Sequence, residues 1–127
     1  MDLLLDTSVL IDALRSRNAR RQLLARLANE GHRFSTTALN IAEVYAGIRP
    51  GENQSTEALL DSLECHDLTA SSGRRAWLLR NEWARKGRTL SLADTIIAAI
   101  AIEKKCRLLT DTQKDFPMPE LNLYPLT

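Results

Sequence analysis

The chain has 127 residues, 44% of them hydrophobic, and its 17 basic and 16 acidic side chains give a formal net charge of +1. This length predicts a single domain spanning residues 1–127, and the near-neutral balance excludes a strongly basic arm or an acidic tail. Two cysteines are too few for a disulfide framework, and we find neither a signal peptide nor a ~20-residue apolar span, so we expect a cytoplasmic protein without a membrane segment.

Short apolar runs alternate with helical patterns along the chain. Residues 2–6 form a compact apolar run, which is typical of a strand buried on both faces of a parallel sheet. Residues 37–48 place apolar side chains at helical spacing and are followed by Pro50 and Gly51. The predicted strands are 2–6, 33–36, 65–68, 107–110 and an edge strand 122–124, and the predicted helices are 9–14, 19–29, 37–48, 55–63, 70–86 and 91–104.

This alternation predicts an α/β domain with a mostly parallel sheet between layers of helices. Ligands of such sheets bind beyond the carboxyl ends of the strands, near the point where the strand order switches. Asp6 and Asp111 each follow a predicted strand directly. We therefore expect both carboxylates to lie at the same edge of the sheet.

Asp6 and Glu43 each have an ordinary structural explanation beside a functional one. Asp6 could cap the helix that follows it, which is a common role for Asp at a strand-to-helix turn. Glu43 points away from the apolar stripe of its helix and shares its face with Ala42, Ala46 and Gly47. It is either a solvated glutamate or part of a cleft into which its small neighbours admit another element.

Asp94 opens a helix that is apolar on nearly every side, where an unpaired charge is costly. Ser91 and Asp94 also match a capping box, in which the carboxylate turns back to the Ser91 amide. Such a bond uses one carboxylate oxygen and leaves the other free. Capping and metal binding are therefore compatible at this position.

Asp111 and Asp115 follow the predicted strand 107–110, and each could instead form a turn. Three or four carboxylates at one sheet edge would raise each other's pKa and destabilise the fold unless a cation neutralised them. A cluster of oxygen ligands without His or Cys favours Mg²⁺ or Mn²⁺ over zinc. The sequence thus predicts a divalent cation site.

Four stretches in this order resemble the PIN-domain ribonucleases, and most closely the VapC-type toxins of type II toxin–antitoxin pairs. They are LLLDTSVLID (3–12), IAEVYAG (41–47), LADTIIAA (92–99) and LLTDTQKDF (108–116). The resemblance covers nearly the whole chain. It implies a PIN-like three-layer α/β/α fold.

By this resemblance Asp6, Glu43 and Asp94 match the acidic residues that bind the metal and act in catalysis. The fourth acid of the family follows the last strand at a variable offset, and we assign it to Asp111, with Asp115 in reserve. Thr110 and either Thr7 or Ser8 match hydroxyls that help to hold the carboxylates or water. The implied activity is an endoribonuclease in which Mg²⁺ or Mn²⁺ activates water to cleave an RNA phosphodiester.

The resemblance also implies a cognate protein antitoxin that covers the acidic site, and a toxin homodimer. Thirteen of the 17 basic residues are arginines, whose planar side chains suit phosphate oxygens. Arginines follow the first motif and precede Asp94, and some of them could bind RNA phosphates, although solvated helix faces explain them equally simply. They are Arg15, Arg17, Arg20, Arg21, Arg74, Arg75, Arg80, Arg85 and Arg88.

Three other classes of protein share this length or fold class. A phosphotransferase of the haloacid-dehalogenase kind needs a second acid two residues after the first, where this chain has Ser8. A phospho-receiver domain needs an acidic pair near the first strand and an acceptor near mid-chain, which we do not find. A PIN-fold binding or scaffold module without nuclease activity would tolerate loss of one of the acids, yet all are present in order.

Overall fold

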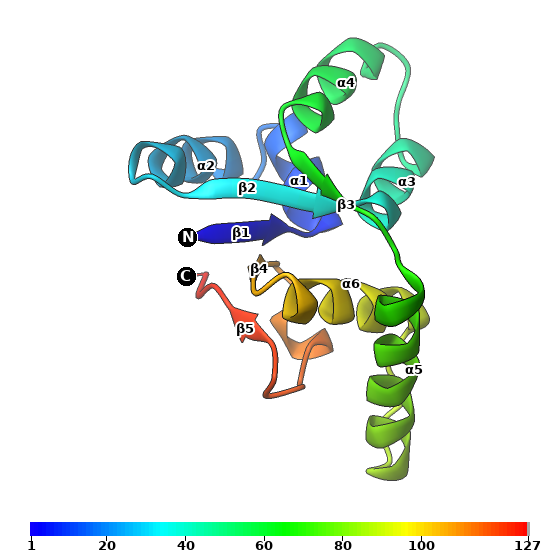
Figure 1. Cartoon of the computed structure of the whole chain (residues 1–127). Helices are drawn as coiled ribbons and strands as arrows, with labels where there is room; N and C mark the ends of the chain where they lie inside the picture. The colour runs from blue at the N-terminus through cyan, green and yellow to red at the C-terminus, as the bar shows by residue number, and fades with distance from the viewer. Residues whose placement is uncertain (127) are drawn as a thin grey trace.

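The structure is a computed structural model that describes residues 1–126, in which strands and helices alternate (Figure 1). Each strand and each α-helix lies close to a segment that the sequence predicts. The strands are β1 (Asp2–Leu5), β2 (Arg33–Thr37), β3 (Glu64–His66), β4 (Arg107–Leu109) and β5 (Asn122–Leu123). The helices are α1 (Thr7–Leu14), α2 (Arg20–Asn29), α3 (Ala38–Ala46), α4 (Asn53–Asp61), α5 (Ala70–Arg85), α6 (Leu92–Glu103) and the short 3₁₀ helix η1 (Gln113–Asp115).

The strands form a parallel sheet in the order β3-β2-β1-β4-β5. The chain moves outward from β1 through β2 to β3, and then crosses to β4 on the other side of β1. The strand order therefore switches between β1 and β4. Asp6 follows β1, and Thr110 and Asp111 follow β4, so the carboxyl ends of these strands place Asp6 and Asp111 at the same edge, as expected.

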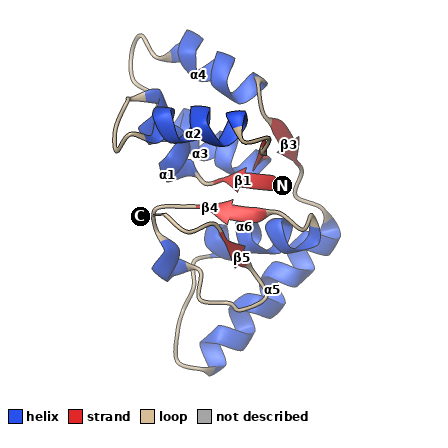
Figure 2. Cartoon of the chain, turned by 90° about the vertical axis from the view of Figure 1, so that its left-hand side faces the viewer, coloured by secondary structure: helices blue, strands red, loops and turns tan. Residues whose placement is uncertain are grey.

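Helices cover both faces of the sheet, with α1 to α4 on one side and α5 and α6 on the other (Figures 1 and 2). The side chains of β1 alternate between two hydrophobic clusters because successive residues of a strand point to opposite faces. Leu3 and Leu5 pack in the cluster that includes α1 to α4, whereas Leu4 packs in the cluster of α5 and α6. The three-layer α/β/α fold is confirmed.

The boundaries differ from the predicted ones mainly where a polar side chain ends an element. Helix α1 begins at Thr7, two residues earlier than expected, because Asp6 is still extended (φ −76°, ψ 161°) and the chain turns directly after it. Helix α3 ends at Ala46 rather than at residue 48, with Gly47 as its C-cap. Helix η1 was not anticipated, and it carries Asp115.

The helices have ordinary lengths for a small globular protein. In the part of the chain that the structure describes, no helix combines the length and the apolar character that crossing a bilayer requires.

Candidate metal centre

Asp6 lies at the end of β1 and is buried, with 7% of its surface exposed. Although it occupies the N-cap position of α1, its side chain makes no capping hydrogen bond. Its Oδ2 accepts from Thr110 Oγ1 at 2.7 Å, and its Oδ1 accepts from Asn40 Nδ2 at 3.1 Å. Both oxygens are therefore oriented by residues of other elements, and the capping explanation for Asp6 does not hold.

Glu43 projects from the middle of α3 toward the start of α1. The Thr7 hydroxyl donates to Glu43 Oε1 at 2.7 Å. Helix α3 takes its place directly after β2 because Thr37 caps it, accepting from the Asn40 amide at 3.1 Å. This hydrogen bond from Thr7 shows that Glu43 faces the carboxyl end of β1 rather than bulk solvent.

Asn40 was missed by the sequence reasoning. It is fully buried, and its side-chain amide donates to Asp6 Oδ1 and also to Thr7 Oγ1 at 2.9 Å. One signal was available, because Asn40 precedes Glu43 by three residues and so lies on the same face of the helix. A polar residue on the same helix face as a carboxylate is a candidate partner of the site to which that carboxylate belongs.

Asp94 lies in the first turn of α6, where Ser91 caps the helix by accepting from the Asp94 backbone amide at 3.0 Å. Within residues 1–126 the return bond of a capping box, in which the Ser91 amide would donate to the Asp94 carboxylate, is not formed. Burial raises the pKa of the Asp94 carboxyl; the hydrogen bond with the Ser91 side chain opposes this rise, and the charges of three other carboxylates add to it. These three are Asp6, Asp115 and Glu43.

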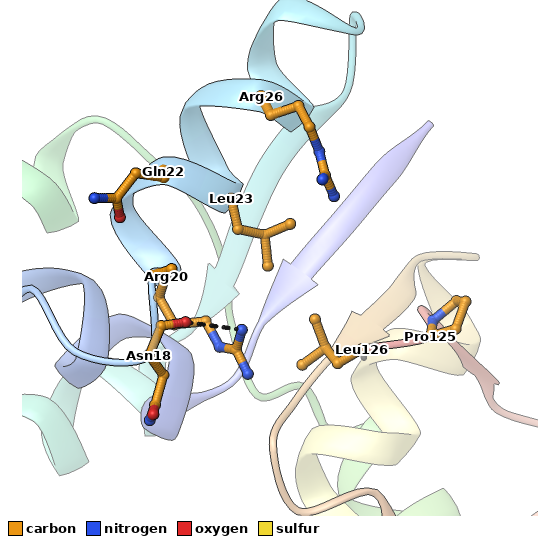
Figure 3. A pocket seen from close by; sticks show the side chains of 8 residues that line it. Asn18, Arg20, Gln22, Leu23, Arg26, Pro125 and Leu126 are labelled. Atoms are coloured by element: carbon orange, nitrogen blue, oxygen red, sulfur yellow. Dashed lines mark hydrogen bonds between the residues drawn. The ribbon is translucent and has the colours of Figure 1, made fainter.

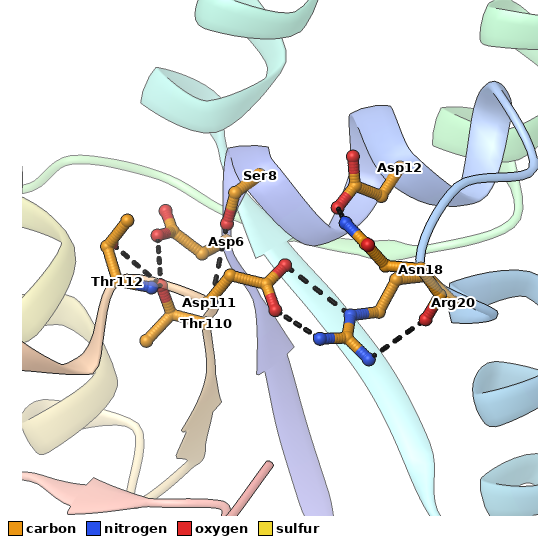
Figure 4. Close-up of polar contacts among 8 residues, drawn as sticks. All are labelled: Asp6, Ser8, Asp12, Asn18, Arg20, Thr110, Asp111 and Thr112. Carbon is orange, nitrogen blue, oxygen red and sulfur yellow. Dashed lines mark hydrogen bonds and ion pairs between the residues drawn. The ribbon is translucent and has the colours of Figure 1, made fainter. Parts of the chain in front are cut away.

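Asp111 has a different partner. Arg20 of α2 forms an ion pair with both of its oxygens, through Nη2 and, at 3.4 Å, through Nε (Figure 4). Its backbone amide donates to Ser8 Oγ at 3.5 Å. The charges of Asp6, Asp115 and Glu43 thus add to the raised pKa of Asp94, whereas Asp111 is paired with Arg20.

The donor set of this candidate site consists of carboxylate and hydroxyl oxygens, which are the ligands that Mg²⁺ and Mn²⁺ prefer. Burial raises the pKa of Asp94 most, and a divalent cation would relieve the smaller contribution from the charges of the neighbouring carboxylates. Among residues 1–126, no three Asp, Glu, His or Cys side chains already converge on a metal-binding arrangement. The chemistry of this donor set fits a divalent cation.

A hollow of about 570 Å³ lies directly beside Thr110. It is lined by Arg20, Leu126 and the segment from Thr110 to Lys114. A second cavity of about 340 Å³ shares Arg20 and Leu126 with it and runs along the start of α2 (Figure 3). The larger hollow therefore borders Thr110, whose hydroxyl donates to Asp6.

Several of the arginines that the sequence offers for RNA binding have hydrogen-bond partners within the chain. Arg15 donates from Nε to Glu52 Oε2 at 3.1 Å and from Nη2 to the Gly47 carbonyl at 3.0 Å. This hydrogen bond with Arg15 is the main cause that lowers the pKa of the Glu52 carboxyl. Arg80 donates to the Leu90 carbonyl at 3.0 Å.

A family model described as PIN domain matches residues 3–117. The chain belongs to the PIN domain family. This match covers all four motifs and both hydrophobic faces of the sheet. It confirms the resemblance on which the assignment of the acidic residues rests.

Similar proteins agree with this membership. Ribonuclease VapC19 of Mycobacterium tuberculosis is 33% identical over 119 residues, which cover 93% of this PIN domain chain and 95% of that protein. A VapBC2 structure from Rickettsia felis, bound to a DNA fragment from its promoter, superposes with a TM-score of 0.84 at 27% identity and 98% coverage of each chain. A toxin–antitoxin complex from Klebsiella pneumoniae gives a TM-score of 0.78 at 26% identity, covering 98% of this chain and 99% of that one.

Proposed function

We propose that this PIN domain is an endoribonuclease that uses a divalent cation, Mg²⁺ or Mn²⁺, and acts as the toxin of a toxin–antitoxin pair. One observation carries the proposal most directly: at the switch point of the sheet both oxygens of the buried Asp6 carboxylate accept hydrogen bonds, from Thr110 and Asn40, and Glu43 accepts from Thr7. The likeness to ribonuclease VapC19 supports RNA as the substrate.

Asp6, Glu43 and Asp94 are the residues that we assign to the cation. When bound, the cation would lower the pKa of a water molecule and offset charge that develops on the phosphoryl oxygens. Thr110 keeps Asp6 oriented, because its hydroxyl donates to the oxygen that faces β4. The neighbouring hollow of about 570 Å³ is large enough for a nucleotide-sized group, and Lys114 supplies a cation on its wall.

Two residues compete for the fourth acidic position. The sequence assigns it to Asp111, but Arg20 already neutralises that carboxylate. Asp115 instead contributes to the charge that surrounds Asp94. The electrostatics therefore favour Asp115 as the fourth carboxylate and give Asp111 the role of holding Arg20 beside the site.

We propose a protein antitoxin as the partner of this chain. The support is the likeness to the Rickettsia felis VapBC2 structure and to the Klebsiella pneumoniae toxin–antitoxin complex, both above 25% identity over nearly the whole chain. The homodimer implied by the resemblance stays a prediction, which native mass spectrometry of the purified protein tests.

Incubation of the purified protein with a mixed RNA pool tests the activity. We expect cleavage with Mg²⁺ or Mn²⁺ and none with excess chelator. Asp6→Asn should reduce the cleavage rate at least about a hundredfold. A direct ligand should matter at least as much as the residues that support ligands, whose loss costs up to about a hundredfold.

Asp12→Asn is the matched control, because it makes the same change of charge in the same motif. The Asp12 carboxylate accepts a hydrogen bond from Asn18 at 2.8 Å on the surface and contacts none of the assigned ligands. The cleavage rate of Asp12→Asn should equal that of wild type. Cleavage that persists in chelator, or that survives Asp6→Asn, would contradict the proposal.

A haloacid-dehalogenase-like phosphotransferase and a scaffold without activity are not favoured. Ser8 occupies the position where the phosphotransferase needs its second acid, and its hydroxyl accepts from the Asp111 backbone amide. A scaffold does not need Asp94 in this place, because the burial and the neighbouring charges that raise the pKa of Asp94 destabilise the folded chain at neutral pH.

A further inference from the structure

Asn40 is a fully buried amide in the first turn of α3. Burial of an amide is costly unless its polar atoms are hydrogen-bonded. Both side-chain N–H groups and the carbonyl oxygen of Asn40 have partners at the carboxyl ends of β1 and β2. Packing alone therefore does not explain why this amide is buried here.

The directions of its hydrogen bonds follow from chemistry alone. An ionised carboxylate only accepts, so the atom that contacts Asp6 Oδ1 at 3.1 Å must be the nitrogen of Asn40. The Thr7 hydroxyl gives its one proton to Glu43, and it must therefore accept from the second N–H of the amide, at 2.9 Å.

The carbonyl oxygen of the amide completes the set. Asn40 Oδ1 accepts from the Thr37 hydroxyl at 2.7 Å. Thr37 itself is buried at the end of β2 and is fixed as the cap of α3. The amide plane is thus anchored on one side, and its two N–H groups point in fixed directions toward the acidic residues.

We propose that Asn40 is a positioning residue that sets the spacing between Asp6 and Glu43 before a cation binds. It holds Asp6 directly and holds Glu43 through the Thr7 hydroxyl, although the two carboxylates come from different elements and repel each other. Pre-organised ligands bind a metal more tightly, because residues around the ligands restrict their orientation. This inference rests on the cation site of the proposed function.

If Asn40 only stabilised the fold, its substitution would leave the Mn²⁺ affinity of the folded protein unchanged. Thr36 offers the comparison, because it is also fully buried at the end of β2 and donates to the Leu5 carbonyl at 3.0 Å. That bond ties β2 to β1 without touching an acidic side chain. Thr36→Val should therefore lower stability and leave the cation affinity of the folded protein unchanged.

The test measures Mn²⁺ affinity by titration, following the electron paramagnetic resonance signal of free Mn²⁺, for wild type, Asn40→Ala, Thr7→Val and Thr36→Val. Urea unfolding in chelator gives the stability of each protein without metal. We expect Asn40→Ala to weaken Mn²⁺ binding about 10- to 100-fold, the usual range for residues behind metal ligands. Thr7→Val should weaken it less, because Asp6 keeps its bond to Asn40.

Asn40→Ala that folds and binds Mn²⁺ like wild type overturns the inference. If Asn40→Ala does not fold, Thr7→Val decides: weaker binding supports the positioning role, and unchanged binding overturns it. Loss of affinity in Thr36→Val equal to that in Asn40→Ala also overturns it, since stability would then explain both. Wild type that binds no Mn²⁺ would instead refute the proposed function, so the two failures are distinguishable.

Discussion

Thr110→Val removes one hydroxyl from a fully buried position while keeping the shape of the side chain. The lost bond, at 2.7 Å to Asp6 Oδ2, has a charged acceptor. Hydrogen bonds to charged groups contribute about 1.5–3 kcal/mol, against about 0.5–1.5 kcal/mol for neutral pairs. The Thr112 amide also loses its acceptor, but Thr112 is exposed and water can replace it. We therefore expect the free energy of unfolding to fall by about 2 kcal/mol.

Urea denaturation at pH 7 in chelator measures this loss, with Thr36→Val as the control. The control deletes a buried threonine hydroxyl that donates to a neutral carbonyl at 3.0 Å, so it should cost about 1 kcal/mol. The comparison isolates the effect of the charge on Asp6. A loss in Thr110→Val no larger than in Thr36→Val would refute the view that this hydroxyl holds an ionised carboxylate.

Three further substitutions test the electrostatics. Because the pKa of Asp94 is raised in the folded protein, ionisation of Asp94 opposes folding. In chelator, the free energy of unfolding of wild type should therefore rise as the pH falls from 7 through that pKa. Asp94→Asn should lack this rise and be the more stable protein at pH 7. Asp115→Asn should weaken Mn²⁺ binding more than Asp111→Asn does, as isothermal titration would show, and the opposite order would return the fourth position to Asp111. Arg15→Met should raise the pKa of Glu52 toward its ordinary value in a carboxyl-carbon NMR titration, and an unmoved pKa would show that the ion pair does not lower it.

The sequence predicted the parallel sheet and the edge at which Asp6 and Asp111 lie, because both depend on local signals. Apolar runs mark the strands, and the carboxyl ends of parallel strands share one edge. The four motifs then assigned the proposed carboxylate ligands in chain order. The fold class and the proposed location of the site follow from patterns that span only a few residues each.

The partners of those carboxylates could not be predicted in the same way. Asn40 bonds Asp6 across 34 positions of the chain, and Arg20 reaches Asp111 across 91. No local pattern encodes such pairs, since they depend on how α2 and α3 pack on the sheet. For the same reason the sequence could not distinguish Asp111 from Asp115. The two residues differ in their neighbours, because Asp111 contacts Arg20 and the charge of Asp115 acts on Asp94.

Anomalous diffraction from crystals of the protein grown with Mn²⁺ tests the central claim most directly, because it locates the cation without reference to activity. The account predicts an anomalous peak at the carboxyl ends of β1 and β4, within coordination distance of Asp6 and Asp94 and with Glu43 bound directly or through water. A peak elsewhere in the molecule, or none at saturating Mn²⁺, would contradict it.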